Sequence, residues 1–202
     1  MKKTLLAIAL GALAVATTAQ AGTNWYVQGD LGVNKLKATD SDLSKTTVSP
    51  SLAVGYDFGD VRVALDYTHY GKVNYGYTEV NGAQTNSATS SFKFQGAGVS
   101  AIYDININKP ITPYVGARLA LNQYKFNEQG VETTTANGAN TIKSFTDSEK
   151  RIMFGYGLIA GAQYKLTDNL SLNGALEYNR LGHVDDVTIY QYGAKAGLRF
   201  DF

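Results

Sequence analysis

The last thirteen residues of the chain alternate strictly between two kinds of side chain. Every even position from Tyr190 to Phe202 is apolar, and every odd position is polar, charged or glycine. A period of two over such a length is typical of a β-strand with one apolar and one polar face. The C-terminal segment therefore predicts a sheet with an apolar environment on one side and a polar one on the other.

The N-terminus has the pattern of an export signal. A basic start, Met1 to Lys3, precedes an apolar run from Leu5 to Ala16 that is too short to span a bilayer, and an Ala-x-Ala pattern ends at Ala21. We expect residues 1–21 to be a cleaved signal peptide and residues 22–202 to form the mature protein.

Composition excludes several classes of function. The absence of cysteine rules out a disulfide scaffold and thiolate metal sites, and two histidines are too few for an ordinary transition-metal site. Eighteen basic against 17 acidic residues give no reason to expect a nucleic-acid partner. We expect no metal and no cofactor.

Seven further segments show the same alternation. With the last strand, the predicted strands are residues 24–36, 47–58, 61–70, 97–103, 113–126, 150–166, 170–180 and 190–202. Long polar connections (residues 37–46, 71–90 and 127–148) alternate with short ones, and no later apolar run approaches the roughly 20 residues of a membrane helix. Open sheet edges cannot be satisfied in lipid. The pattern therefore predicts an all-β, eight-stranded antiparallel transmembrane barrel of the outer-membrane type, with short periplasmic turns and longer extracellular loops.

Two segments fit this pattern poorly. In the fourth strand, Phe92 and Phe94 fall on the phase opposite to the predicted lipid-facing residues, which suggests a bulge near Gly96 or a later start. In the second strand, Pro50 lacks a backbone donor and is expected at a bulge or a loop edge.

Two stretches of the predicted barrel resemble a known family. Ala101-Ile-Tyr-Asp104, followed by Lys109-Pro-Ile-Thr-Pro-Tyr-Val-Gly-Ala-Arg-Leu-Ala-Leu-Asn122, is similar to the opacity family of small outer-membrane proteins. The resemblance implies a cell-surface protein of a Gram-negative outer membrane that stabilises the envelope and displays loops for adhesion. In this family the binding of host receptors and serum factors is a property of the loops.

The register places eight charged side chains inside the predicted barrel. They are Asp30, Asp57, Arg62, Asp66, Arg118, Glu177, Lys195 and Arg199. An eight-stranded barrel is only wide enough to be filled by side chains, and buried charges must pair. We interpret the set as a structural network. A narrow porin-like channel for small ions or solutes is the first alternative, and a catalytic pair among these groups is the second.

A lipid-active barrel enzyme would need a Ser-His-acid set at the lipid face. Neither His69 nor His183 has a serine two residues away, so we expect no enzyme activity. The neighbouring Asp185 and Asp186 supply too few oxygens for a calcium site.

The predicted surface suggests three partners. The apolar positions Tyr192, Leu198, Phe200 and Phe202 of the last strand form a candidate signal for the barrel-assembly machinery. Lipid and lipopolysaccharide would surround the barrel, with Tyr70 and Phe126 in the outer aromatic girdle and Lys143, Lys150 and Arg151 as a small basic patch. Residues 71–90 and 127–148 would contact a host surface ligand, for which Tyr75, Tyr77 and Phe145 are candidate anchors.

Overall fold

The structure is a computed structural model that describes residues 24–39, 44–107, 110–136, 139–184 and 187–202. The predicted signal peptide, residues 1–21, lies outside this range, and so do Asp185 and Asp186.

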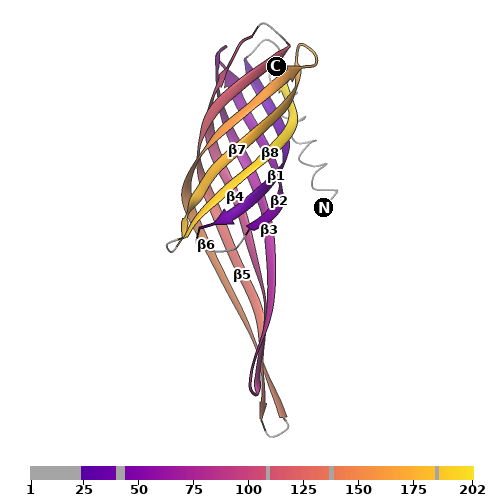
Figure 1. Ribbon diagram of the computed structural model, residues 1–202, viewed down its shortest axis with the longest axis vertical. Helices are drawn as coiled ribbons and strands as arrows, with labels where there is room; N and C mark the ends of the chain where they lie inside the picture. Colours follow the sequence, from indigo (N-terminus) through magenta and orange to yellow (C-terminus); the bar gives the residue numbers. More distant parts are fainter. Residues whose placement is uncertain (1–23, 40–43, 108–109, 137–138, 185–186) are drawn as a thin grey trace.

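Eight antiparallel strands form a closed barrel (Figure 1), which confirms the predicted fold class. In chain order they are β1 (Trp25–Ala38), β2 (Ser44–Asp57), β3 (Val61–Asn81), β4 (Gln84–Asp104), β5 (Ile111–Ala136), β6 (Ala139–Lys165), β7 (Leu170–Val184) and β8 (Val187–Asp201). Each strand pairs with its neighbours in sequence, and β1 also pairs with β8 from Tyr26↔Asp201 to Ala38↔Ile189. This last pairing closes the sheet into a ring, so that every strand has a neighbour on both sides.

The two ends of the barrel differ greatly in length. The C-terminus and the short connections after β2, β4 and β6 lie at one end, and long hairpins project from the other (Figure 1). Because short turns are periplasmic in such barrels, the long hairpins project outward from the cell.

The prediction that residues 71–90 and 127–148 are loops is wrong. β3 to β6 continue as paired strands to Asn81↔Gln84 and Ala136↔Ala139, and β4 stays paired with β5 as far as Gln84↔Thr134. Ladder hydrogen bonds satisfy the backbone of these polar segments, so no apolar face is needed to form strands. We call residues 71–94 and 124–151 the projecting sheet.

Two β-bulges mark the borders of the projecting sheet. β2 pairs with β3 only as far as Ser51↔Thr68, and β6 pairs with β7 only as far as Tyr156↔Arg180. Just beyond these points the register shifts between His69 and Gly71 in β3 and between Arg180 and Gly182 in β7. Gly71 has φ +112°, and a Cβ there would strike the Thr47 side chain. Glycine therefore allows β3 to turn away from β2.

At each border, where the backbone hydrogen bonds between neighbouring strands stop, one side chain donates a hydrogen bond across the gap. The Thr47 hydroxyl donates to the Tyr70 carbonyl at 2.5 Å, and the Asn122 amide donates to the Leu181 carbonyl at 2.7 Å. The expected bulge at Pro50 is absent, since Pro50 pairs in register with Leu31 on β1. Pairing of β2 with β3 stops one residue away, at Ser51, so Pro50 lies where β2 begins to run free on that side.

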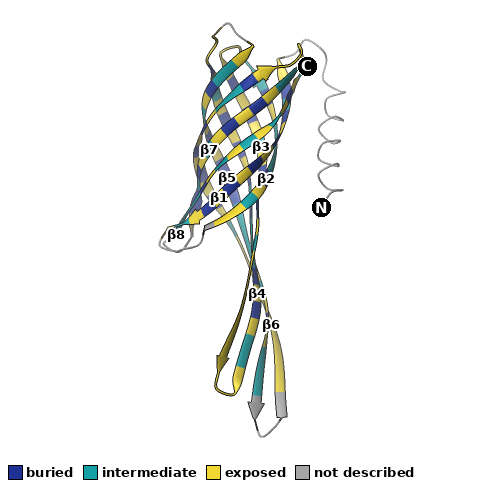
Figure 2. Cartoon of the chain, turned by 45° about the vertical axis from the view of Figure 1, so that its right-hand side comes forward, coloured by how far each residue is buried: buried dark blue, intermediate teal, exposed yellow. Residues whose placement is uncertain are grey.

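Burial along the barrel strands follows the alternation of the sequence (Figure 2). β1 shows exposed and buried residues in turn, with Leu31 and Val33 53% and 58% exposed and the polar Asp30 and Asn34 buried. This is the reverse of a water-soluble protein, so the outer surface is suited to hydrocarbon. Among the residues described, no helix is long and apolar enough to cross a membrane.

Candidate functional site in the barrel interior and on the projecting sheet

Arg118 is the central cation in the half of the barrel interior that lies nearer to the projecting sheet. Its guanidinium binds both oxygens of Asp66, with Nη2 at 2.5 Å from Oδ1 and Nε at 2.9 Å from Oδ2, and Nη1 donates to the Tyr70 hydroxyl at 2.6 Å. Gly98 on β4, which pairs with Asp66, lies against the guanidinium, and a Cβ there would lie 2.8 Å from it. The missing side chain therefore gives Arg118 the space to reach Asp66.

A second network surrounds Lys195 in the middle of the barrel. Its ammonium lies 2.6 Å from Glu177 and 3.7 Å from Asp30. Asp30 also accepts hydrogen bonds from Asn173 at 2.8 Å and from Gln28 at 2.9 Å. The extra donors compensate two carboxylates that share one lysine.

The periplasmic part of the interior holds two arginines. Arg62, 1% exposed, forms a bidentate pair with Asp104 at 2.6 and 2.7 Å. Arg199 binds Asp57 at 2.6 Å, pairs with Asp201, and lies 4.0 Å from the centre of the Tyr26 ring. All eight predicted residues therefore form ion pairs in the barrel interior, and Arg62 is the one whose partner, Asp104, is not among the predicted carboxylates.

Two members of this network were absent from the predicted set. Asp104 lies just beyond the predicted fourth strand, residues 97–103, and Asp201 lies on the polar face of the last predicted strand. Both follow an outward-facing aromatic residue in their strands, Tyr103 and Phe200, which are 53% and 40% exposed. The period of two already pointed both carboxylates inward.

Amides and apolar side chains fill the interior towards the outer mouth. Asn179 donates to Gln191 at 2.5 Å, and Gln191 donates to Asn34 at 2.8 Å. Above them, four buried side chains pack together as the mouth cluster, which consists of Leu36, Tyr70, Phe94 and Leu181. The cavity between the charged layers measures only about 30 Å³, which is room for a few water molecules.

The mouth cluster corrects three predictions. Tyr70 is 1% exposed and lies inside the barrel, so it is not a girdle residue. Phe126 packs on Phe92 with ring centroids 5.1 Å apart, on the face that continues the barrel interior. β4 has no bulge at Gly96 and does not start late, because Phe92 and Phe94 belong to the interior phase and meet apolar neighbours there.

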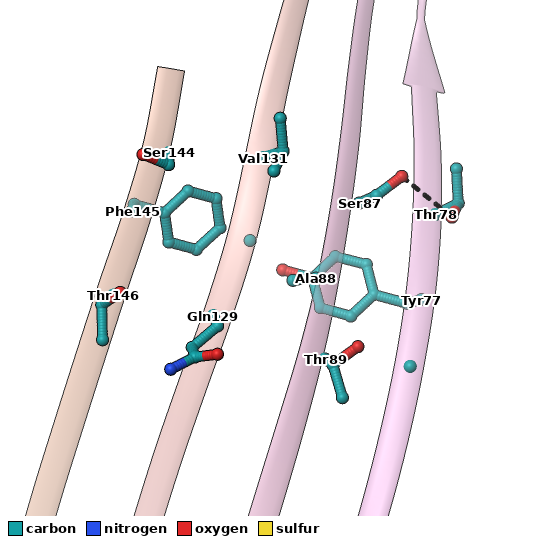
Figure 3. A pocket seen from close by; sticks show the side chains of 12 residues that line it. Tyr77, Thr78, Ser87, Ala88, Thr89, Gln129, Val131, Ser144, Phe145 and Thr146 are labelled. Carbon is teal, nitrogen blue, oxygen red and sulfur yellow. Dashed lines mark hydrogen bonds between the residues drawn. The ribbon is translucent and has the colours of Figure 1, made fainter. Parts of the chain in front are cut away.

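The projecting sheet contains a pocket with a volume of about 710 Å³ (Figure 3). Its centre is one cross-strand row in which Tyr77, Ala88, Gly130 and Phe145 lie side by side on β3, β4, β5 and β6. A Cβ on Gly130 would overlap the Phe145 ring. The row thus places two aromatic rings beside two small residues, and the Thr, Ser and Gln residues that also line the pocket alternate with this row along the strands.

Hydrogen bonds fix one side of this pocket. Tyr77 donates to Oε1 of Glu128 at 3.2 Å, and the Ser90 hydroxyl donates to Oε2 at 3.1 Å. The bond to the carboxylate, together with its charge, raises the pKa of Tyr77. Tyr77 therefore stays neutral at physiological pH and presents its ring as an amphipathic surface.

The two histidines take no part in these networks. His69 lies on the outer face beside Gln95, next to the β3 bulge, and His183 contacts the Thr188 hydroxyl at 3.1 Å. No group of three or more His, Cys, Asp or Glu residues within the described ranges is arranged to hold a metal ion.

The predicted assembly residues of β8 lie on the outer surface. Tyr192, Leu198 and Phe200 are 39%, 50% and 40% exposed, and Phe202 packs on Phe200 with ring centroids 5.4 Å apart. The Phe202 amide donates to the Trp25 carbonyl at 3.1 Å, so the chain end is fixed to β1.

Comparisons with known proteins agree on one family. The family model described as "Opacity family porin protein" matches residues 54–202. "Protein opa" of Haemophilus influenzae is 41% identical over 74% of this chain and 100% of its own length, and an opacity protein of Neisseria gonorrhoeae is 30% identical over 77% and 78%. The crystal structure of Neisserial surface protein A superposes with a TM-score of 0.61 at 28% identity, covering 89% of this chain and 98% of that one.

Proposed function

Since the chain belongs to the opacity family of outer-membrane porin proteins, we propose that it is a non-enzymatic surface protein that presents its projecting sheet to molecules of a host or a neighbouring cell. The observation that carries this proposal is the aromatic-walled pocket of about 710 Å³ on four strands that extend beyond the barrel mouth. Exposed aromatic side chains are typical anchors for a binding partner.

Export and assembly are part of the same proposal. Residues 1–21 would direct the chain through the inner membrane and be removed. The outward-facing Tyr192, Leu198, Phe200 and Phe202 would be recognised by the barrel-assembly machinery, and the apolar wall would then be surrounded by lipid and lipopolysaccharide.

Shortening the projecting sheet at matched positions tests the adhesive role. Asn74↔Ser91 and Asn127↔Ser148 are cross-strand pairs, so replacing residues 75–90 and 128–147 by Asn-Gly turns preserves the register below them. We expect cells with this variant to bind host surfaces no better than cells without the protein, measured by counting adherent bacteria. The mouth cluster is retained, and a shift between boiled and unboiled gel mobility confirms that the barrel is folded.

A point variant separates the pocket from the rest of the sheet. Tyr77→Ala with Phe145→Ala removes both rings, whereas Val80→Ala with Ile142→Ala removes two exposed side chains of the opposite face. The first variant is expected to lose most adhesion and the control to keep it. Full adhesion by the shortened barrel would refute the proposal, and equal effects of the two point variants would refute the role of the pocket.

The filled interior argues against the alternative of a narrow channel. Four cation-centred networks and the mouth cluster lie along the barrel, with a cavity of about 30 Å³ between the charged layers. We expect refolded protein in planar bilayers to show no steady single-channel openings. Regular openings would favour the channel instead.

A further inference from the structure

A row of four lysines crosses the projecting sheet just above the barrel. Lys72 pairs with Lys93, Lys93 with Lys125, and Lys125 with Lys150, so one lysine comes from each of β3, β4, β5 and β6. Neighbouring strands are about 4.8 Å apart, so the four side chains leave the sheet within about 14 Å. We call this row the lysine ladder.

The lysine ladder lies on the face that continues the lipid-facing surface of the barrel. Lys93 lies between Phe92 and Phe94, both of which pack in or against the mouth cluster on the opposite face. Towards the membrane, the next outward row contains Gln95 and Gln123, which are hydrogen-bonded at 3.0 Å. The row after that contains Leu121, 61% exposed, and belongs to the apolar wall. Ile152 on β6 lies in the same row as Gln123 and is 66% exposed. The nearest exposed apolar side chain is therefore about 7 Å from the ladder on β6 and about 14 Å from it on β5.

Charge is divided between the two faces of the projecting sheet. Its carboxylates all belong to the inner face: Glu79, Glu128, Glu132, Asp147 and Glu149. From the ladder to the hairpin tips, the outer face carries no carboxylate within the described residues; its first row beyond the ladder is Asn74, Ser91, Asn127 and Ser148. None of the ion pairs formed by the described residues includes a ladder lysine.

Such a row favours the binding of an anion from outside the chain. Like charges directly opposite one another destabilise a sheet. Lys93 and Lys125 are also half-buried, which reduces their access to water. Only one row, which includes Gln95, Gln123 and Ile152, separates the ladder from the apolar wall. In a bilayer the headgroup phosphates lie just outside the hydrocarbon region, at a comparable height. Lysine suits this place because its stem lies along apolar surface while its ammonium reaches the headgroup.

We propose that the lysine ladder binds the phosphate groups of outer-leaflet lipid headgroups, chiefly those of phosphorylated lipopolysaccharide. Each phosphate would lie between lysines of adjacent strands and neutralise their repulsion. The bound lipid would fix the base of the projecting sheet against the membrane, with its acidic inner face turned away from the lipid phosphates. This inference does not depend on the adhesive role.

The test uses the mature full-length protein refolded in nanodiscs of phosphatidylcholine. Purified lipopolysaccharide is added, and the number of molecules retained by each protein is measured by native mass spectrometry over a concentration series. Lys93→Gln with Lys125→Gln removes the two central charges. Lys143→Gln is the matched control, because Lys143 is an exposed lysine on the inner face of the same sheet. A second ligand series uses enzymatically dephosphorylated lipopolysaccharide.

We expect the central double variant to bind phosphorylated lipopolysaccharide about tenfold more weakly than the wild type. The Lys143→Gln control should bind as the wild type does. Dephosphorylated lipopolysaccharide should bind the wild type and the double variant equally and weakly. Unchanged affinity of the double variant, or equal affinity for the two lipid forms, would overturn the proposal. Inorganic phosphate or a sulfated oligosaccharide that binds the ladder as tightly as the lipid does would overturn the assignment to a lipid.

Discussion

Replacement of Arg118 by methionine is expected to lower the free energy of unfolding by about 3–5 kcal/mol. The substitution keeps an unbranched side chain of similar length but removes the bidentate contact to Asp66 and the hydrogen bond to Tyr70. Asp66 would then remain largely buried as an unpaired carboxylate. The hydroxyl of Tyr70, a residue of the mouth cluster, would lose its hydrogen-bond partner. The measurement is urea unfolding in lipid vesicles, monitored through the fluorescence of Trp25, the only tryptophan of the chain.

Two further variants distinguish the loss of the ion pair from the loss of side-chain packing at Arg118. Asp66→Asn combined with Arg118→Met removes both charges, and we expect it to recover part of the lost stability because no unpaired ion remains. Arg180→Met removes an arginine of the outer surface that lies 5.8 Å from the Tyr156 ring centre, and its cost should stay below about 1 kcal/mol. A loss below about 1 kcal/mol for Arg118→Met would show that the interior network does not stabilise the barrel.

The period of two predicted the barrel wall correctly because each strand there separates two constant environments. From Trp25 to Asn34 and from Gln191 to Phe202, one face meets hydrocarbon and the other meets the polar interior. Hydrophobicity and phase agree in this region. The family resemblance includes Ala101 to Asp104 at the end of β4 and Ile111 to Asn122 on β5, and it is confirmed by the family match to residues 54–202.

At the outer mouth, the hydrophobicity of a residue and its place in the inward–outward alternation of the strand disagree. There the alternation predicts correctly which way the side chain faces. Tyr70, Phe94 and Phe126 all occupy the phase of the interior, but their apolar character suggested lipid-facing positions. The structure buries Tyr70 and Phe94 because the four long strands leave the membrane while the interior still has to be closed. The polar side then faces outward, as Lys93 and Lys125 show.

The length of β3 to β6 could not be predicted from single strands. Residues 71–90 and 127–148 are rich in Thr, Ser, Asn and Gly, which is also the composition of loops. Their strand structure depends on pairing between segments far apart in sequence, such as Lys93↔Lys125. The pocket and the lysine ladder arise only from this pairing, because the pocket takes three residues and the ladder one residue from each of four strands.

Truncation of Leu181 to alanine is expected to lower the free energy of unfolding by about 2–5 kcal/mol. Leu181 is 1% exposed and packs with Leu36, Tyr70 and Phe94, so its loss leaves a cavity between rigid strands. Asn122 holds the Leu181 carbonyl at 2.7 Å and limits the collapse of the site.

Leu176 provides the matched control for this prediction. It lies on the same strand, five residues earlier, but faces outward and is 66% exposed. Leu176→Ala should change the free energy of unfolding by about 1 kcal/mol or less, since lipid chains can fill the vacated space. Both variants are measured by urea unfolding in the same vesicles. If Leu176→Ala lowers the free energy of unfolding as much as Leu181→Ala does, the mouth cluster stabilises the barrel no more than the lipid-facing residues do. If only Leu181→Ala is costly, the outer mouth is closed by a packed apolar core.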